Sequence, residues 1–133
     1  METTDQGNQM KPKVYQYEKC STCRKATKWL LEKGIEFTSR PIREQPPSVK
    51  ELRAMVAMHG GEIRKLFNTS SKDYRDPELK ALLPTLSEKE TLELLAGRGN
   101  LIKRPFVIGD EIALQGFKEE VWEEAFSPNS SLH

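Results

Sequence analysis

Two cysteines, Cys20 and Cys23, are separated by two residues at the point where the hydrophobic pattern of the chain changes. The alternating residues 13–17 before them predict a strand, and apolar residues at helical spacing behind them predict a helix over 21–33. Cys20 would then precede the first helical turn, where unpaired backbone N–H groups and the helix dipole favour a negative charge. The neighbouring cations, which favour it further, are Lys19, Arg24 and Lys25. We therefore expect Cys20 to be partly thiolate near neutral pH.

Three interpretations of this pair imply different chemistry: two structural cysteines, half of a zinc site, or a redox pair. A structural zinc ion takes four nitrogen or sulfur ligands, and the only histidines are His59 and His133, so we expect no metal site. A C-x-x-C pair beside a strand–helix unit, in a chain for which we expect no secretory leader, is typical of thioredoxin-like redox centres. Because Cys23 lies one helical turn after Cys20, we expect the two sulfurs to lie close enough to form a disulfide.

Three motifs resemble those of a known family: Tyr17-x-x-Cys20-Ser-Thr-Cys23-Arg24-Lys25-Ala26, Glu44-Gln-Pro46-Pro47-Ser48 and Leu101-Ile-Lys-Arg104-Pro105. In this order they are similar to the glutaredoxin-coupled arsenate reductase (ArsC) family, which includes the Spx-type transcription regulators. The resemblance covers residues 13–126. It implies an α/β, thioredoxin-like (glutaredoxin-like) mixed sheet flanked by helices, with a helical insertion at about residues 48–96.

The resemblance also implies roles for Arg104 and Pro105. Thioredoxin-like folds hold a cis-proline opposite the reactive cysteine, and the Arg104-Pro105 pair of this sequence occupies that place. A cis bond is otherwise found at only about one X-Pro bond in twenty. Arg104 would then offer the planar donors of its guanidinium to an oxyanion or to the Cys20 thiolate.

The sequence departs from the arsenate-reducing members in two respects. Those members bind the oxyanion with three arginines, and the matching positions here are Asn68, Arg104 and Gly116, so only one arginine is retained. They also carry serine where this chain has Cys23, and they complete their cycle with external glutathione and glutaredoxin. A local Cys23 allows an intramolecular disulfide instead. We therefore expect thiol redox chemistry, with weak or absent reduction of arsenate.

The elements that would position these residues are also predicted. Residues 35–40 alternate like a second strand, which would lie parallel to the first and complete a β-α-β unit with a right-handed crossover. Two capping boxes, Ser48 with Glu51 and Ser87 with Glu90, open helices within the predicted insertion.

Alternating segments at 106–108 and 112–114 flank a Gly-Asp-Glu turn and predict a hairpin, which a helix over 118–126 follows. Four single residues receive structural interpretations. We expect core or half-buried helix positions for Trp29 and Trp122, a helix C-terminal cap for His59 and a solvated side chain for Arg64.

Length and charge set limits on the organisation of the chain. With 133 residues and a formal net charge of +1, it predicts one domain, over 13–126, without a global attraction to nucleic acid or membranes. Residues 1–12 are polar and residues 127–133 follow the last helix, so we expect a disordered extension and a frayed tail. No segment has the length and apolarity of a membrane span. We expect a cytoplasmic monomer, in which two cysteines are more often redox-active than a permanent crosslink.

The sequence thus predicts an arsenate reductase-like thiol oxidoreductase, with Cys20 as nucleophile, Cys23 as resolving thiol and Arg104 as charge stabiliser. The substrate would be a small thiol or an oxyanion, and the reductant would be glutathione, thioredoxin or glutaredoxin, with no bound cofactor. Two alternatives remain: a Spx-like redox-sensing regulator that binds RNA polymerase, and a true glutaredoxin-dependent arsenate reductase. The residues expected to contact the substrate are Ser21, Thr22, Arg24 and Pro105.

Overall fold

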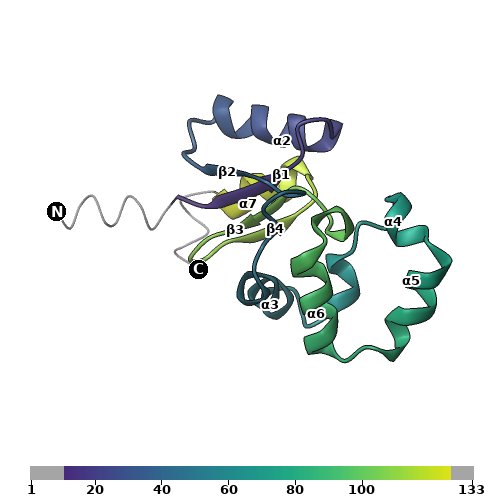
Figure 1. The fold of residues 1–133 in the computed structure, drawn as a ribbon. Coiled ribbons are helices and arrows are strands. Elements are labelled where there is room, and N and C mark those ends of the chain that lie inside the picture. The colour runs from purple at the N-terminus through teal and green to yellow at the C-terminus, as the bar shows by residue number, and fades with distance from the viewer. Residues whose placement is uncertain (1–10, 127–133) are drawn as a thin grey trace.

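The computed structural model describes residues 11–126. The predicted tail over 127–133, and the predicted extension over 1–12 apart from Lys11 and Pro12, lie outside the described residues. The sheet has the order β2-β1-β3-β4 (Figure 1). β1 pairs parallel to β2 and antiparallel to β3, which pairs antiparallel to β4. The strands are β1 (Lys13–Gln16), β2 (Thr38–Pro41), β3 (Phe106–Ile108) and β4 (Ala113–Gln115).

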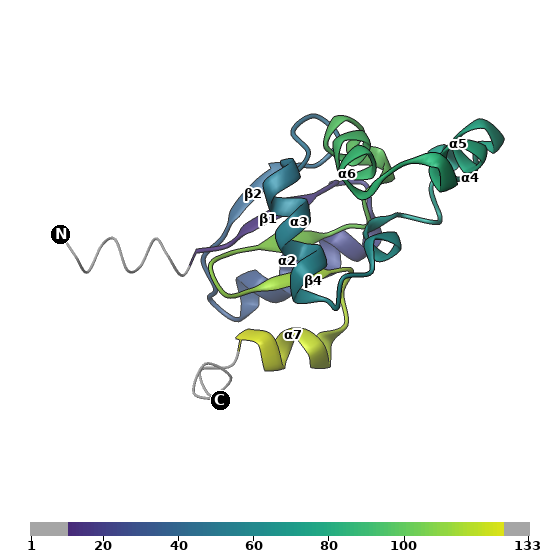
Figure 2. The same ribbon diagram turned by 90° about the horizontal axis from the view of Figure 1, so that it is seen from below.

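Helices cover both faces of this sheet. α2 (Ser21–Glu32) and α7 (Glu119–Phe126) pack on one face and α3 (Val49–Met58) on the other. Figure 2 shows α3 crossing in front of the strands, with α2 behind them. The mixed sheet flanked by helices is therefore confirmed. Within residues 11–126, no helix is both long and apolar enough to cross a membrane.

The predicted insertion is a run of short helices that extends past one end of the sheet (Figure 1). After α3 its elements are η1 (Ile63–Leu66), α4 (Lys72–Arg75), α5 (Pro77–Leu82), η2 (Leu83–Thr85) and α6 (Glu88–Gly97), and η3 (Gly99–Leu101) extends the insertion beyond the predicted end near residue 96. Both predicted capping boxes are present, at Ser48 with Glu51 and at Ser87 with Glu90. α3 and α6 therefore begin where the sequence places their caps.

The face under α2 and α7 has an aromatic core. Trp29 and Trp122 are buried, as predicted, and meet edge to face with their ring centroids 5.8 Å apart. Phe117 packs edge to face on Trp122 at 4.9 Å. The indole N–H of Trp122 donates to the backbone oxygen of Gly116 at 3.1 Å, which ties α7 to the end of β4. This packing fixes the position of α2 against the sheet.

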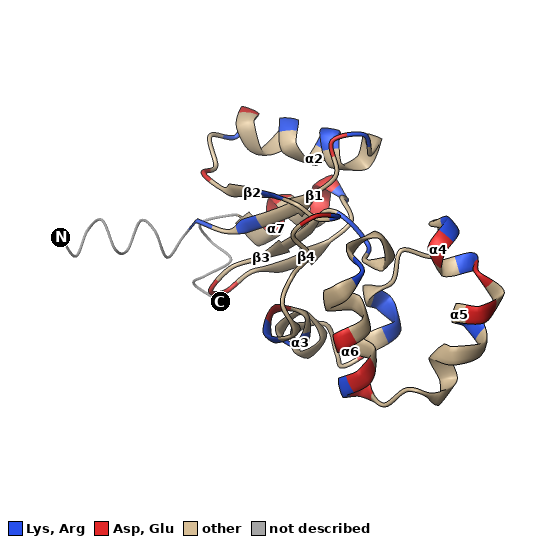
Figure 3. Cartoon of the chain, in the orientation of Figure 1, with Lys and Arg blue, Asp and Glu red and all other residues tan. Residues whose placement is uncertain are grey.

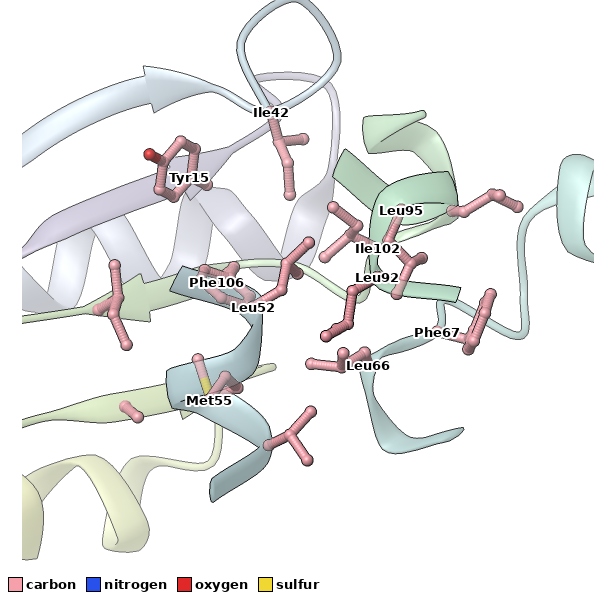
Figure 4. Close-up of a cluster of buried hydrophobic side chains, with 14 of the residues drawn as sticks. Tyr15, Ile42, Leu52, Met55, Leu66, Phe67, Leu92, Leu95, Ile102 and Phe106 are labelled. Carbon is pink, nitrogen blue, oxygen red and sulfur yellow. The ribbon is translucent and has the colours of Figure 1, made fainter. Parts of the chain in front are cut away.

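The opposite face has a mainly aliphatic core, which joins the sheet to the insertion (Figure 4). Alternate strand residues divide between the two cores, as strand geometry requires: Val14 lies in the aromatic core and Tyr15 in the aliphatic one. Leu92 and Leu95 of α6 are fully buried there. The insertion is therefore part of the domain core and not a separate unit.

Glu51 holds the start of α3 against the sheet. Its carboxylate accepts from the Lys13 ammonium at 2.8 Å and from the Tyr15 hydroxyl at 2.7 Å, besides the backbone N–H of Ser48. Burial alone would raise the pKa of Glu51, but these hydrogen bonds outweigh it and lower the pKa. The capping box predicted from the sequence thus also links α3 to β1.

Three strands differ from their predicted bounds, and the first of them, β1, ends at Gln16, one residue earlier than predicted. The second strand was expected over 35–40, but β2 begins at Thr38, because Ile35 and Phe37 instead pack against the aromatic core. In the hairpin, the N–H of Gly109 donates to the backbone oxygen of Ile112 at 2.9 Å. That bond places Ile112 in the turn, so β4 begins one residue later than predicted.

Candidate active site

Cys20 lies at the junction between β1 and α2. Its N–H donates to the backbone oxygen of Tyr17 at 2.9 Å, and its own backbone oxygen accepts from the N–H of Arg24 at 3.0 Å. The first bond closes the turn and the second begins the helix, so Cys20 occupies the N-cap position in extended conformation. No side chain caps α2, and no acidic residue lies in its first turn. The partial positive charge of the helix start is therefore available to the half-exposed sulfur of Cys20.

Cys23 lies one turn further into the helix and is fully buried. Its sulfur accepts from the backbone N–H of Tyr17 at 3.5 Å. Burial is the largest influence and raises the pKa of the Cys23 thiol to about 12. A hydrogen bond with Cys20 and the charge of Cys20 raise this pKa further, whereas the Tyr17 N–H and the Arg104 guanidinium lower it. Both cysteines are free thiols, and Cys23 is protonated at neutral pH.

Arg104 is half-buried and precedes Pro105 through a cis peptide bond, as predicted from the resemblance. Two nitrogens of its guanidinium donate to the side-chain oxygen of Asn100, at 3.3 Å and 3.2 Å. The guanidinium also lies over the ring of Tyr17, 5.2 Å from the ring centroid. These contacts hold Arg104 beside the cysteine turn.

Tyr17 carries a second cation. The guanidinium of Arg43 lies 4.9 Å from the centroid of its ring and donates to its hydroxyl at 2.9 Å. A tyrosine ring attracts cations through its negative faces. Tyr17 therefore links the cysteine turn to Arg104 and to the loop after β2.

A groove of about 1130 Å³ opens beside the cysteine turn and is lined by Cys20, Thr22 and Arg104. Asn68 and Gly116, which match arginine positions of the arsenate-reducing proteins, line the same groove. The three matched positions therefore line the same groove as the nucleophile, but only one of them carries a guanidinium. A single guanidinium offers fewer charge-assisted hydrogen bonds to a multiply charged oxyanion than three would.

The other predicted contact residues lie in different surroundings. Thr22 lines the groove, whereas Ser21, Arg24 and Pro105 do not. Arg24 is exposed and donates to the backbone oxygen of Glu18 at 3.0 Å. Pro105 is buried, and its backbone oxygen accepts from the N–H of Gly116 at 2.9 Å. In this structure Arg24 thus stabilises the turn, and Pro105 shapes the strand behind it.

Several residues in and around the site received no role or a different one from the sequence. Asn100 orients Arg104, but a lone asparagine in a loop gives no sequence signal. Arg64 is exposed, as predicted, and also lines the groove. His59 occupies the C-cap position of α3, but its Nε2 lies 2.6 Å from the backbone oxygen of Ala113 in β4. Since a carbonyl only accepts, Nε2 carries the proton. In residues 11–126, no three His, Cys, Asp or Glu side chains are grouped to hold a metal ion.

Comparisons with known proteins agree with this geometry. Residues 15–125 match the model of the ArsC family. The uncharacterized protein YusI of Bacillus subtilis is 51% identical over 110 residues, which cover 83% of this chain and 93% of YusI. The global transcriptional regulator Spx of Enterococcus faecalis is 32% identical over 107 residues, which cover 80% of each protein.

A solved structure is similar throughout the described domain. It is the crystal structure of a protein related to the ArsC family from Bacteroides fragilis, with a TM-score of 0.78 and 45% sequence identity. The match covers 88% of this chain and 98% of that one. The sheet, the insertion and the cysteine turn therefore lie within the region shared with known proteins.

Proposed function

The chain belongs to the ArsC family, and from this premise we propose that it is a thiol–disulfide oxidoreductase. Cys20 is the nucleophile, Cys23 the resolving thiol and Arg104 the charge stabiliser. The observation that carries this proposal is the contrast between the two cysteines. Cys20 is half-exposed in a groove with Arg104, whereas Cys23 is buried one helical turn behind it.

The reaction has two displacement steps. The Cys20 thiolate attacks one sulfur of a substrate disulfide, the substrate S–S bond breaks, and one substrate thiolate leaves. Cys23 then loses its proton and attacks the Cys20 sulfur, so that the second substrate thiol leaves and a Cys20–Cys23 disulfide forms. Two electrons pass from the protein to the substrate, and an external thiol reductant restores the cysteine pair.

Burial and charge give these steps their order. Before the first step, the hydrogen bond and the charge of Cys20 both raise the pKa of Cys23. Once Cys20 is in a mixed disulfide, its charge and its hydrogen bond no longer raise the pKa of Cys23, whereas burial, the largest cause, still does. Formation of the adduct therefore makes deprotonation of Cys23 easier than it is in the free protein, while burial keeps Cys23 protonated at rest.

Arg104 acts on charge that develops at sulfur. Negative charge moves from the attacking sulfur to the leaving sulfur, and a preorganised guanidinium beside that path stabilises the transition state. The contacts to Asn100 and Tyr17 keep Arg104 in place before substrate binds. Reductants that fit this chemistry are glutathione, thioredoxin and glutaredoxin in the reducing cytoplasm, which we propose as the compartment.

A coupled assay tests the proposal. The purified chain is given a small neutral disulfide, and NADPH consumption is followed with thioredoxin and its reductase, and in parallel with glutathione, glutaredoxin and glutathione reductase. We expect turnover that depends on Cys20 in at least one system. In a parallel arm with arsenate we expect little turnover, because Asn68 and Gly116 stand at two of the three arginine positions. Absence of disulfide turnover in both systems would refute the proposal.

A second function is favoured by the 32% identity to the regulator Spx. In a Spx-like protein the cysteine pair is a switch, and the partner implied by the resemblance is RNA polymerase. Affinity capture from lysate under reducing and oxidising conditions separates the two functions. Redox-dependent recovery of polymerase subunits, together with no coupled turnover, would favour the regulator.

A further inference from the structure

The groove beside Cys20 has a charge that differs from the rest of the chain. The whole sequence is nearly balanced, with 21 basic and 20 acidic residues, and Figure 3 shows both signs spread over the helices. In the groove lining, Glu62 is the acidic residue, and it is paired with Lys65 at 3.4 Å. The basic residues that line the groove are Lys19, Arg64, Lys65, Lys103, Arg104 and Lys118.

Four of these cations come from separate segments around the nucleophile. Lys19 lies in the turn before α2, Arg64 in η1, Lys103 directly before Arg104, and Lys118 directly before α7. All four are exposed, and none forms an ion pair with another residue in the described part of the chain. Like charges gathered without counter-charges repel one another, so this arrangement favours an anionic partner over an empty groove.

Lys103 is the most firmly anchored of the four. Its backbone N–H donates to the backbone oxygen of Leu66 at 2.8 Å, and its own backbone oxygen accepts from the Gln115 side chain at 3.1 Å. Its side chain runs past Gly116, where an added Cβ would lie 3.1 Å from the lysine Cε. The missing side chain at this arginine-matched position therefore leaves room for the aliphatic part of Lys103.

The size of the groove decides between a small anion and a longer one. Pockets for drug-sized ligands enclose about 300–1,000 Å³, and this groove, at about 1130 Å³, exceeds that range. Its cations come from four separate segments: the turn before α2, η1, the residues before β3 and the residue before α7. An extended chain with several separate carboxylates matches this distribution better than a single compact oxyanion.

We propose that the groove binds an acidic peptide segment of a partner protein and presents the disulfide of that segment to Cys20. This inference rests on the proposed function. Cys20 attacks the peptide sulfur, the bond to the second sulfur breaks, and a thiolate leaves, while the carboxylates on either side lie against Lys103, Arg64 and Lys118. Complementary charge of this kind mainly raises the rate of association and the selectivity.

The test uses short synthetic peptides with capped ends and one cysteine, joined by a disulfide to 2-thiopyridine. Attack by Cys20 on the peptide sulfur releases 2-thiopyridone, whose absorbance reports the rate. One peptide carries glutamates on both sides up to four residues away, a second carries lysines there, and a third carries glutamates only next to the cysteine. The neutral compound methyl 2-pyridyl disulfide reports the reactivity of Cys20 itself.

We expect the long acidic peptide to react about tenfold faster than the basic peptide at low salt, with the ratio falling as salt screens the charges. Lys103→Glu and Arg64→Glu should each remove most of this preference. The matched controls are Lys50→Glu and Arg53→Glu, which make the same charge changes on exposed residues of α3 outside the groove lining. The controls should keep the preference and react normally with the neutral disulfide, and the peptide rates of Lys103→Glu and Arg64→Glu are each divided by that variant's own rate with the neutral disulfide.

The outcomes separate this inference from the proposed function. If the neutral disulfide fails to react with the wild-type protein, the proposed thiol chemistry fails and the inference with it. If the neutral disulfide reacts but the acidic and basic peptides react equally, only the inference fails. The peptide with glutamates up to four residues away and the peptide with glutamates only next to the cysteine could also react at equal rates. The groove would then recognise only a small anion, and the inference would be wrong.

Discussion

Two parts of the site are held in place by different kinds of contact. They are the cysteine turn, which carries Cys20 and Cys23, and the wall of the groove, which is formed by η1 and the residues before β3. The turn, over residues 16–24, depends on bonds between near neighbours in the sequence, such as the 2.9 Å bond from Cys20 N–H to the Tyr17 oxygen. The wall depends on contacts between distant segments. The N–H of Asn68 donates to the oxygen of Leu101 at 2.7 Å, and Lys103 reaches back to Leu66. The reactive sulfurs are thus encoded locally, whereas their surroundings are encoded by the whole insertion.

This difference separates reactivity from selectivity. A substitution at Cys20 removes the attacking sulfur and leaves the fold intact, because Cys20 is half-exposed and the hydrogen bonds that shape the turn are made by its backbone. A substitution in the insertion changes which molecules reach the sulfur and can disturb the aliphatic core that it shares with the sheet (Figure 4). Four predictions test this separation, and the largest effect comes first.

Cys20→Ser should abolish turnover without altering stability. A serine hydroxyl is not ionised at neutral pH and cannot form the mixed disulfide, so we expect a loss of at least about 10³-fold in kcat/KM. The half-exposed position makes the change in unfolding free energy small, within about 0.5 kcal/mol. Coupled NADPH consumption and urea unfolding measure the two quantities. A large loss of stability would show that the turn is not independent of the fold.

Gly99→Ala should have the opposite effect: it should lower the stability of the fold without abolishing turnover. An added Cβ at Gly99 would collide with the backbone oxygen of Ile42, and forced overpacking of this kind costs about 3 kcal/mol. Gly97, two residues earlier at the end of α6, has open space around it. Gly97→Ala is therefore the matched control and should be neutral or stabilising by up to about 1 kcal/mol. If Gly99→Ala and Gly97→Ala unfold at the same urea concentration, the backbone near Ile42 moves aside at little cost and the prediction is wrong.

The same separation explains what the sequence could predict. The strand–turn–helix around Cys20, the two capping boxes and the buried tryptophans follow from local patterns, and all are present. The cis bond at Arg104-Pro105 came from the resemblance, because local preference favours trans. The sequence predicts β2 three residues too early, because Ile35 and Phe37 alternate with polar residues as they would in a strand. In the structure they belong to a loop whose apolar side chains pack against the core.

The groove could not be predicted in this way. Lys103 and Arg64 are ordinary exposed cations in the sequence, and only the contacts of η1 and the residues before β3 bring them to the same opening. Asn100 gave no signal, because its hydrogen bonds to Arg104 depend on the turn that η3 makes. The charge of the groove is therefore a property of the fold, and the balanced charge of the whole chain conceals it.

Cys23 should make stability depend on pH. The pKa of a free cysteine is about 8.5, and the folded value is raised to about 12, mainly by burial. Between these values the folded chain binds the proton and the unfolded chain does not, so the stability from Cys23 is complete below pH 8.5 and falls as the pH rises. From pH 8.5 to 10 we expect a loss of about 1.5 kcal/mol.

Cys23→Ala should lack this loss when both proteins are unfolded by urea under reducing conditions. Burial also raises the pKa of Tyr15, but both proteins carry Tyr15, so its influence cancels in the difference. A parallel fall in the two proteins would contradict a raised pKa at Cys23. A loss seen only in the protein with Cys23 would confirm the contrast within the turn, where Cys20 is half-exposed and Cys23 is buried in the core.

Asn100→Ala should have the smallest effect of the four. It tests whether the insertion, through Asn100, contributes to the chemistry at the cysteine turn. Asn100 belongs to η3 at the end of the insertion, yet its oxygen accepts two hydrogen bonds from Arg104. Its loss leaves the guanidinium charged but less well oriented, so we expect the rate with a neutral disulfide to fall about fivefold, near 1 kcal/mol. In an Arg104→Ala background the same substitution should have no further effect, because residues that act through one contact are not additive. A fivefold loss in both backgrounds would mean that Asn100 acts through the fold. A loss confined to the protein with Arg104 would show that the insertion orients the chemistry as well as selecting the substrate.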